Sequence, residues 1–117
     1  MTNKYRLSKK PKKILDDGTK LYRLIALKDF SNVKKGDKGG YVEKESNLCQ
    51  RGDAWVYSKA QVFGNAMVYG NAQVYGNAMV YDNAWVYSKA QVCGDVRVCG
   101  NARVYSDAQC RGEEYDQ

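Results

Sequence analysis

Histidine, proline and long apolar runs are what this 117-residue sequence has least of, with no His and one Pro. No apolar stretch approaches the roughly 18 residues of a membrane-spanning helix, and no signal-peptide core follows Met1. We therefore expect a soluble, cytoplasmic protein that does not bind a membrane. The one proline, Pro11, precedes the repetitive part of the chain. A proline-free repeat suits a sheet, because most backbone N–H groups there donate to neighbouring strands.

A six-residue repeat runs from Ala54 to Cys110. From Ala66 it is Ala-Met-Val-Tyr-Gly-Asn, Ala-Gln-Val-Tyr-Gly-Asn and Ala-Met-Val-Tyr-Asp-Asn. The first position of the repeat is Ala except at Val96, and the third position is Val until Cys110. A period of six with a small residue two places before an aliphatic one is typical of a β-helix.

Each repeat predicts one short strand and one corner. Because side chains alternate between the faces of a strand, Ala and Val point inward and the residue between them points outward. The Tyr-Gly-Asn that follows contains residues that tolerate positive φ, as a corner requires. If three strands close a triangle, one coil uses eighteen residues, and residues eighteen apart lie above one another.

This pattern resembles the hexapeptide-repeat proteins, which fold as single-stranded left-handed parallel β-helices. The resemblance covers roughly residues 41–110 and implies an all-β triangular prism; at eighteen residues per coil it has about four coils. The left-handedness is implied by the family alone. We assign residues 41–112 to the β-helix and 113–117 to a short tail. In the first coil we expect Val42 and Leu48 at the Ala position, with Lys44 and Gln50 at the Val position.

The first forty residues have a different composition. Twelve Lys or Arg against four Asp give this segment a charge of +8. Residues 12–15 and 20–27 flank Asp16-Asp17-Gly18, a hairpin signal, and residues 34–40 predict a glycine-rich loop. We interpret residues 1–40 as a β-hairpin that caps the open end of the β-helix. A second interpretation is nucleic-acid contact through Lys9, Lys10, Lys12 and Lys13.

A second resemblance involves residues 21–30, 39–43 and 47–48. They are similar to an amino-terminal block that precedes the repeats in uncharacterised bacterial and prophage hexapeptide-repeat proteins. Some of those proteins carry an acyltransferase label that rests on fold alone. A resemblance to prophage proteins would suit an inhibitor of a host or defence complex.

The eighteen-residue period sorts the outward residues into three faces. One face carries Trp55, Gln73, Gln91 and Gln109, a second carries Gln61, Met79 and Arg97, and a third carries Cys49, Met67, Trp85 and Arg103. We name as the aromatic face the residues of the third side and its corner that are apolar, aromatic or arginine: Met67, Tyr69, Trp85, Tyr87, Arg103 and Tyr105. Such a composition is enriched in interface cores, so we interpret this face as a partner-binding surface. The alternative is an ordinary solvated side whose stacked tyrosines cover the backbone.

No set of residues predicts a catalytic site, a metal site or a cofactor. The resemblance implies that an acyltransferase of this fold would use His as general base and that a carbonic anhydrase would need three His ligands, and the chain has none. The Gly-Asn pairs are corners and not a phosphate-binding loop. The four cysteines do not lie eighteen residues apart, so we expect them to be reduced.

Three functions remain, in order of preference. The first is a non-catalytic protein-binding or assembly module whose partner is itself, as a dimer or trimer, or another protein. The second is an acyltransferase-like enzyme of the hexapeptide-repeat family. The third is a nucleic-acid binder that uses the basic amino-terminal segment.

Overall fold

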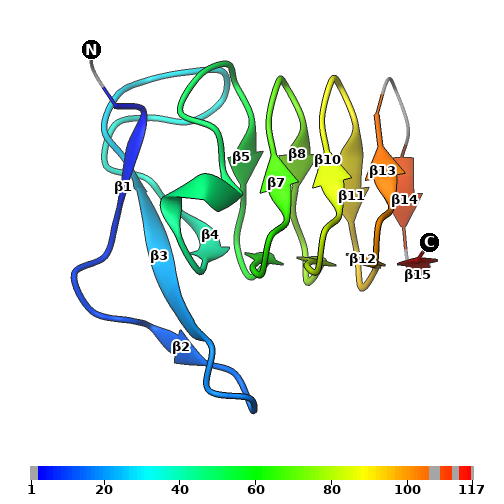
Figure 1. Cartoon of the computed structure of the whole chain (residues 1–117). Helices are drawn as coiled ribbons and strands as arrows, with labels where there is room; N and C mark the ends of the chain where they lie inside the picture. Colours follow the sequence, from blue (N-terminus) through cyan, green and yellow to red (C-terminus); the bar gives the residue numbers. More distant parts are fainter. Residues whose placement is uncertain (1–2, 106–108, 112–113, 117) are drawn as a thin grey trace.

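The computed structural model describes residues 3–105, 109–111 and 114–116. These residues form a parallel β-helix whose first coil continues into an antiparallel sheet at the amino-terminal end (Figure 1). The coils follow one another along a single axis, from the amino-terminal sheet to β15. The predicted all-β fold, a parallel β-helix of about four coils with an amino-terminal cap, is confirmed.

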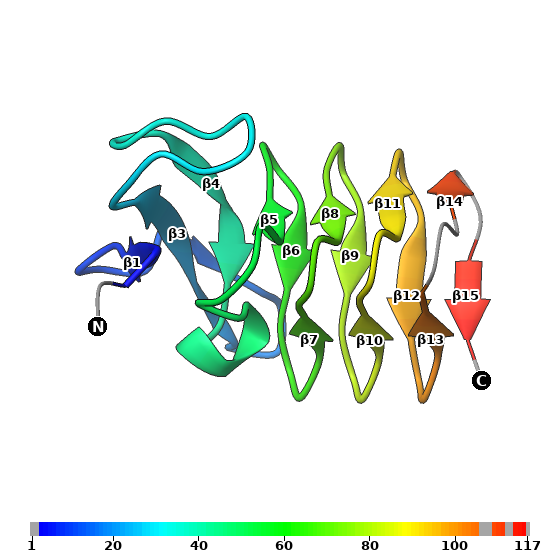
Figure 2. The ribbon, with the colours of Figure 1, turned by 90° about the horizontal axis from the view of Figure 1, so that it is seen from above.

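Two of the three sides of the β-helix are purely parallel sheets. One side consists of β5 (Trp55–Val56), β8 (Gln73–Val74), β11 (Gln91–Cys93) and β14 (Gln109–Arg111). The next consists of β7 (Met67–Val68), β10 (Trp85–Val86) and β13 (Arg103–Val104). Figure 2 shows these short strands side by side, each one coil from the next.

The register between coils is the predicted eighteen residues wherever the repeat is regular. Met67 pairs with Trp85, and Trp85 pairs with Arg103. Backbone hydrogen bonds continue through the corners, where Asn71 N donates to Ser88 O at 2.8 Å. The three predicted columns of outward residues are therefore confirmed, except for Cys49.

The interior is filled by the Ala and Val of the repeat, as predicted. Each of these side chains within the described residues 54–104 is at most 1% exposed. The corners turn at a residue with positive φ, such as Gly76 at +71°. A Cβ on Gly76 would lie only 2.8 Å from the backbone N of Gly94 in the next coil, so glycine suits this corner for both its φ and its small size. Ser88 adopts a similar φ of +59° at an equivalent corner.

The third side is an eight-stranded mixed sheet, which joins the amino-terminal segment to the β-helix. Its strands are β1 (Tyr5–Leu7), β2 (Lys13–Ile14), β3 (Lys20–Ala26), β4 (Lys38–Val42), β6 (Gln61–Val62), β9 (Met79–Val80), β12 (Arg97–Cys99) and β15 (Glu114–Asp116). β3 pairs antiparallel with β1, β2 and β4, and β4 pairs parallel with β6. The predicted hairpin exists as β2 and β3, which turn at Gly18. The cap thus extends one side of the prism.

Trp55 shows how this segment covers the first coil. We expected its side chain to point outward on a mostly amide face, yet it is 1% exposed. The rings of Tyr5 and Phe30 meet it edge-on, at 6.2 and 5.2 Å between centroids. Trp55 therefore points out of the prism, as predicted, but it is covered by Tyr5 and Phe30 of the amino-terminal segment.

The predicted register of the first coil is wrong by two residues. Val42 pairs with Val62, and Leu48 bridges Val68, so both occupy the Val position and not the Ala position. The shift is absorbed at the corner of residues 49–53, which has five residues where the regular corners have three. Asp53 N and Ala54 N both donate to Gly70 O in the next coil, at 3.1 and 3.0 Å. Cys49 consequently faces the Tyr69 position and not Met67.

Three smaller differences concern boundaries. The loop predicted at residues 34–40 ends earlier, because β4 begins at Lys38, and β4 crosses the expected boundary at residue 40. A short 3-10 helix, η1 (Glu45–Asn47), lies in the first coil, and Lys44 next to it is exposed. The tail expected at residues 113–117 contains β15, which pairs with β12.

Candidate functional site

The aromatic face is built on β7, β10 and β13, which place three unlike side chains in one column. Met67, Trp85 and Arg103 take the outward position of the repeat in three successive coils, because the inward positions are filled by Ala and Val. Met67 is 38% exposed, and the other two are held against each other. The column is therefore an apolar strip with a basic residue at its end.

A ladder of three tyrosines borders this column at the adjoining corner. The rings of Tyr69 and Tyr87 stack at 4.9 Å with 5° between their planes, and those of Tyr87 and Tyr105 at 5.4 Å with 13°. Stacking turns the ring faces toward one another, so the ladder presents ring edges and hydroxyl groups outward. Tyr105, at the end of the ladder, is 52% exposed. Burial raises the pKa of the Tyr69 hydroxyl, which stays neutral at physiological pH.

Arg103 is tied to the surface of the molecule. Its guanidinium carbon lies 4.2 Å from the centre of the Trp85 ring, which is a cation–π contact. Its Nη1 also donates to Asn101 O at 2.8 Å. Trp85 in turn meets Tyr69 edge-on at 6.2 Å. These contacts connect the column to the tyrosine ladder, so the six residues predicted for the aromatic face lie together on one side of the β-helix.

The lysines predicted as a nucleic-acid contact lie along the edge of the amino-terminal sheet. Lys9 and Lys10 are exposed in the connection between β1 and β2, next to Pro11, and Lys12 follows. Lys13 differs, since its Nζ lies 5.6 Å from the centre of the Tyr41 ring. Lysine and proline are features that keep an edge strand from pairing with another chain. This position gives the lysines a structural role that needs no nucleic acid.

The described part of the chain contains neither a metal-binding cluster nor a membrane-spanning helix. Among the residues whose side chains the structure describes, 3–105, no group of three His, Cys, Asp or Glu lies close enough to hold a metal ion. Within the described ranges, no helix is long and apolar enough to cross a membrane.

Cys110, expected inside the prism, lies in β14, outside the residues with described side chains. The Cys99 thiol hydrogen-bonds Tyr81, and burial together with this bond raises the pKa of Tyr81 to about 12.

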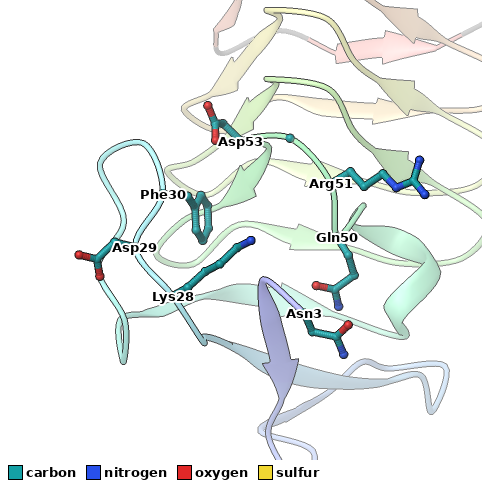
Figure 3. A pocket seen from close by; sticks show the side chains of 8 residues that line it. Asn3, Lys28, Asp29, Phe30, Gln50, Arg51 and Asp53 are labelled. Carbon is teal, nitrogen blue, oxygen red and sulfur yellow. The ribbon is translucent and has the colours of Figure 1, made fainter. Parts of the chain in front are cut away.

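One feature near the amino terminus was not predicted from the sequence. The five-residue corner and the 28–30 loop enclose a cleft, shown in Figure 3, that contains Lys28, Phe30 and Gln50. The sequence carries only an indirect signal of this cleft. Residues 49–53 interrupt the six-residue period. The interruption can be seen in the sequence once Val42 and Leu48 are aligned with the Val position of the repeat.

The comparisons with known proteins agree with this geometry. The model of the YdcK β-solenoid repeat matches residues 60–74, 72–88 and 90–105. An alignment 62 positions long, which covers 48% of this chain, is 39% identical to part of the Escherichia coli (strain K12) protein named uncharacterized acetyltransferase YdcK. That alignment covers 19% of the relative, so the chain matches about a fifth of the relative's length.

The matched repeats coincide with the regular coils. Residues 60–105 contain β6 to β13, where the eighteen-residue register holds and where the aromatic face lies. Strands β1 to β4 lie outside the residues that the repeat model matches. With its six-residue period, its parallel sheets and its matches to the YdcK repeat, the chain is similar to the hexapeptide-repeat β-helix proteins.

Proposed function

We propose that this chain is a non-catalytic protein-binding module and that its aromatic face is the contact surface. The observation that carries the proposal is the gathering of Met67, Trp85 and three tyrosines beside Arg103 in neighbouring coils. Aromatic residues, Met and Arg are enriched in interface cores. The β-helix exposes them on one side of a rigid framework.

The packing of the face favours binding for a second reason. Ring stacking and the Arg103–Trp85 contact already restrict the side chains in the unbound protein. Few side chains would therefore lose rotamer freedom when a partner binds. Each flexible side chain that is immobilised on binding makes the binding free energy less favourable by about 0.5–1.5 kcal/mol. The surface is pre-organised in this sense.

The partner is either a second copy of this chain or a different protein. A standard interface buries about 800 Å² on each partner. The aromatic face spans three coils, with strands about 4.8 Å apart, so its central column is roughly 10 Å long. A lateral dimer or trimer would need contacts beyond the six residues. A phage-encoded inhibitor of a host complex is a narrower version of this proposal and stays a prediction.

Acyl transfer is the second candidate, favoured only by the printed name of the Escherichia coli relative. The chain has no His to act as the general base that the hexapeptide acyltransferases use. Titration with acetyl-CoA tests this candidate directly. Saturable binding together with acetyl transfer to an amine or hydroxyl acceptor would replace the binding-module proposal.

The main test combines light scattering with affinity capture. Trp85→Glu places a charge at the centre of the aromatic face, and Gln73→Glu places the same charge on another side as a control. We expect Trp85→Glu to abolish self-association, or the capture of a specific partner, while Gln73→Glu retains it. Circular dichroism would establish that both variants are folded. Equal behaviour of the two folded variants would contradict the proposed surface.

A further inference from the structure

A cleft of ≈ 870 Å³ lies where three parts of the chain meet at the amino-terminal end of the β-helix. Its wall consists of Asn3 before β1, residues 28–30 after β3 and residues 50–53 of the five-residue corner. Ligand pockets in proteins typically have volumes of about 300–1,000 Å³. The cleft has the size of a small-molecule site, and neither the aromatic face nor the matched repeats include it.

The side chains that line the cleft are cationic, amide and aromatic. In Figure 3 the side chain of Lys28 extends past the ring of Phe30 toward Gln50, whose amide is hydrogen-bonded to the backbone of Lys4 and Tyr5. The two carboxylates of the wall point away from the centre in the same view. Asp29 has a structural reason for this, because its Oδ1 accepts a hydrogen bond from Lys35 N at 2.8 Å.

A buried cation underlies the same site. Lys4 is 1% exposed, and its Nζ donates to Ala54 O at 2.6 Å and Gly52 O at 3.3 Å. Both acceptors are neutral carbonyl groups, so these bonds leave the positive charge of Lys4 in place. Burial lowers the pKa of Lys4 to about 8, which keeps the amine mostly protonated at pH 7. The nearby Asp53 carboxylate raises the pKa of Lys4 and so offsets part of this charge, and Lys4 and Lys28 together supply two cations at the site.

Phe30 supplies a fixed apolar wall. Its ring meets Trp55 edge-on at 5.2 Å and lies 5.0 Å from the Nζ of Lys4. Its backbone is held by two hydrogen bonds with Val33, at 2.9 and 2.7 Å. Gln50 is fixed as well, since its Oε1 accepts from Lys4 N at 2.8 Å. The site is thus formed before any ligand arrives.

We propose that this cleft binds small organic carboxylates that carry a flat apolar group. The carboxylate would pair with the Lys28 ammonium above the buried charge of Lys4, and the flat group would pack on Phe30. A charge-assisted hydrogen bond is about twice as strong as a neutral one, so the anion is the part of the ligand that sets affinity. This inference is independent of the proposed function, because it involves no residue of the aromatic face.

Three probes that share a naphthalene ring and carry a negative, neutral or positive substituent test the inference by calorimetry and by chemical-shift mapping of the full chain. They are 2-naphthoate, 2-naphthamide and 2-naphthylmethylammonium. We expect saturable binding of 2-naphthoate with shifts at the Gln50 side-chain amide. The neutral amide should bind about tenfold more weakly, as expected for the loss of a charge-assisted hydrogen bond.

Two variants and one control complete the experiment. Lys28→Gln should weaken 2-naphthoate binding about tenfold and leave 2-naphthamide binding unchanged, since only the ion pair is lost. Phe30→Leu should weaken both probes, and Lys59→Gln, at an exposed corner of the regular coils, should change neither. Absence of saturable binding, equal affinity for the acid and the amide, a preference for the ammonium probe, or an unchanged Lys28→Gln would each overturn the proposal.

Discussion

The guanidinium carbon of Arg103 lies 4.2 Å from the ring centre of Trp85, and the two residues are paired in register on β13 and β10. The contact has a consequence for how the aromatic face would work. Nη1 of Arg103 is directed to the backbone oxygen atoms of Asn101 and Asn83, at 2.8 and 3.4 Å. In the proposed interface Arg103 would therefore contribute mainly by fixing the orientation of Trp85.

Replacing Arg103 by Met tests this contact. Met keeps an apolar stem over Trp85 but removes the charge, so we expect a loss of about 0.5–1 kcal/mol in the free energy of unfolding. Arg97 is also exposed and lies beside Met79 on another side, so Arg97→Met is the matched control. Urea denaturation of both variants measures the difference. A loss as large in Arg97→Met would show that the Trp85 contact adds nothing to stability.

The inward and outward positions of the repeat can be separated by one substitution in each. Val80 is 0% exposed, so Val80→Asp buries an unpaired carboxylate, which destabilises a protein by several kcal/mol. Gln73→Asp introduces the same group at an outward, half-buried position and should change stability little. Thermal unfolding followed by circular dichroism measures both. Similar melting temperatures would contradict the assignment of the two faces.

The sequence predicts the structure well where the same pattern of residues recurs in every coil, and poorly where a segment occurs once. Each regular coil repeats the same inward Ala and Val, so the pattern alone gives the register that Met67, Trp85 and Arg103 adopt. The first coil has no such redundancy. One of its two extra residues, Gln50, is held by hydrogen bonds with Lys4 and Tyr5, more than forty positions earlier in the chain. Burial of Trp55 likewise depends on Phe30, and a local period cannot reveal such long-range packing.

Gly76 provides a test of the corner geometry. An Ala at this corner would adopt a left-handed φ and would also bring its Cβ within 2.8 Å of Gly94 N. Gly18, in the hairpin turn, has a φ of +91°, but a Cβ on Gly18 would meet no atom within 4 Å. Both Ala variants should lose about 1–2 kcal/mol through the backbone conformation. Gly76→Ala should lose measurably more in chemical denaturation, and equal losses would argue against tight stacking of the corners.

Alkaline unfolding should report on Tyr5. Burial raises the pKa of its hydroxyl above the usual value near 10, and the hydroxyl donates to Glu45 O at 2.9 Å and to Leu48 O. A group with a raised pKa in the folded state gives stability that is complete below pH 10 and is lost as the pH rises further. Tyr5→Phe should be less stable at pH 7 by about 1–3 kcal/mol, because buried carbonyl groups lose their donor. The gap between the two proteins should narrow above pH 10, and a constant gap would contradict the raised pKa.

Besides the pairing of β4 with β6, the corner of residues 49–53 also attaches the amino-terminal segment to the β-helix. Gln50 Oε1 accepts from Lys4 N at 2.8 Å and Tyr5 N at 3.2 Å, and its Nε2 donates to Tyr5 O at 3.3 Å. Without Gln50 and Arg51 the corner would be Cys49-Gly52-Asp53. That sequence has the same residue types as Cys93-Gly94-Asp95, a regular three-residue corner between β11 and β12.

Deleting Gln50 and Arg51 together should therefore preserve the β-helix and release the segment that covers it. Gly52 already has a φ of +76°, as the regular corner requires. Tyr5 and Lys4 would lose the bonds of their backbone to Gln50, which loosens the layer over Trp55, and this side chain, now 1% exposed, would become accessible to water. We expect a red shift of tryptophan emission and rapid proteolysis near Lys9 and Lys10, with the far-ultraviolet spectrum of the β-helix retained. Gln50→Ala is the control, because it removes the same hydrogen bonds but keeps the corner length. If the deletion unfolds the chain while Gln50→Ala leaves it folded, the two extra residues are needed for the β-helix itself and not only for attaching the segment that covers it.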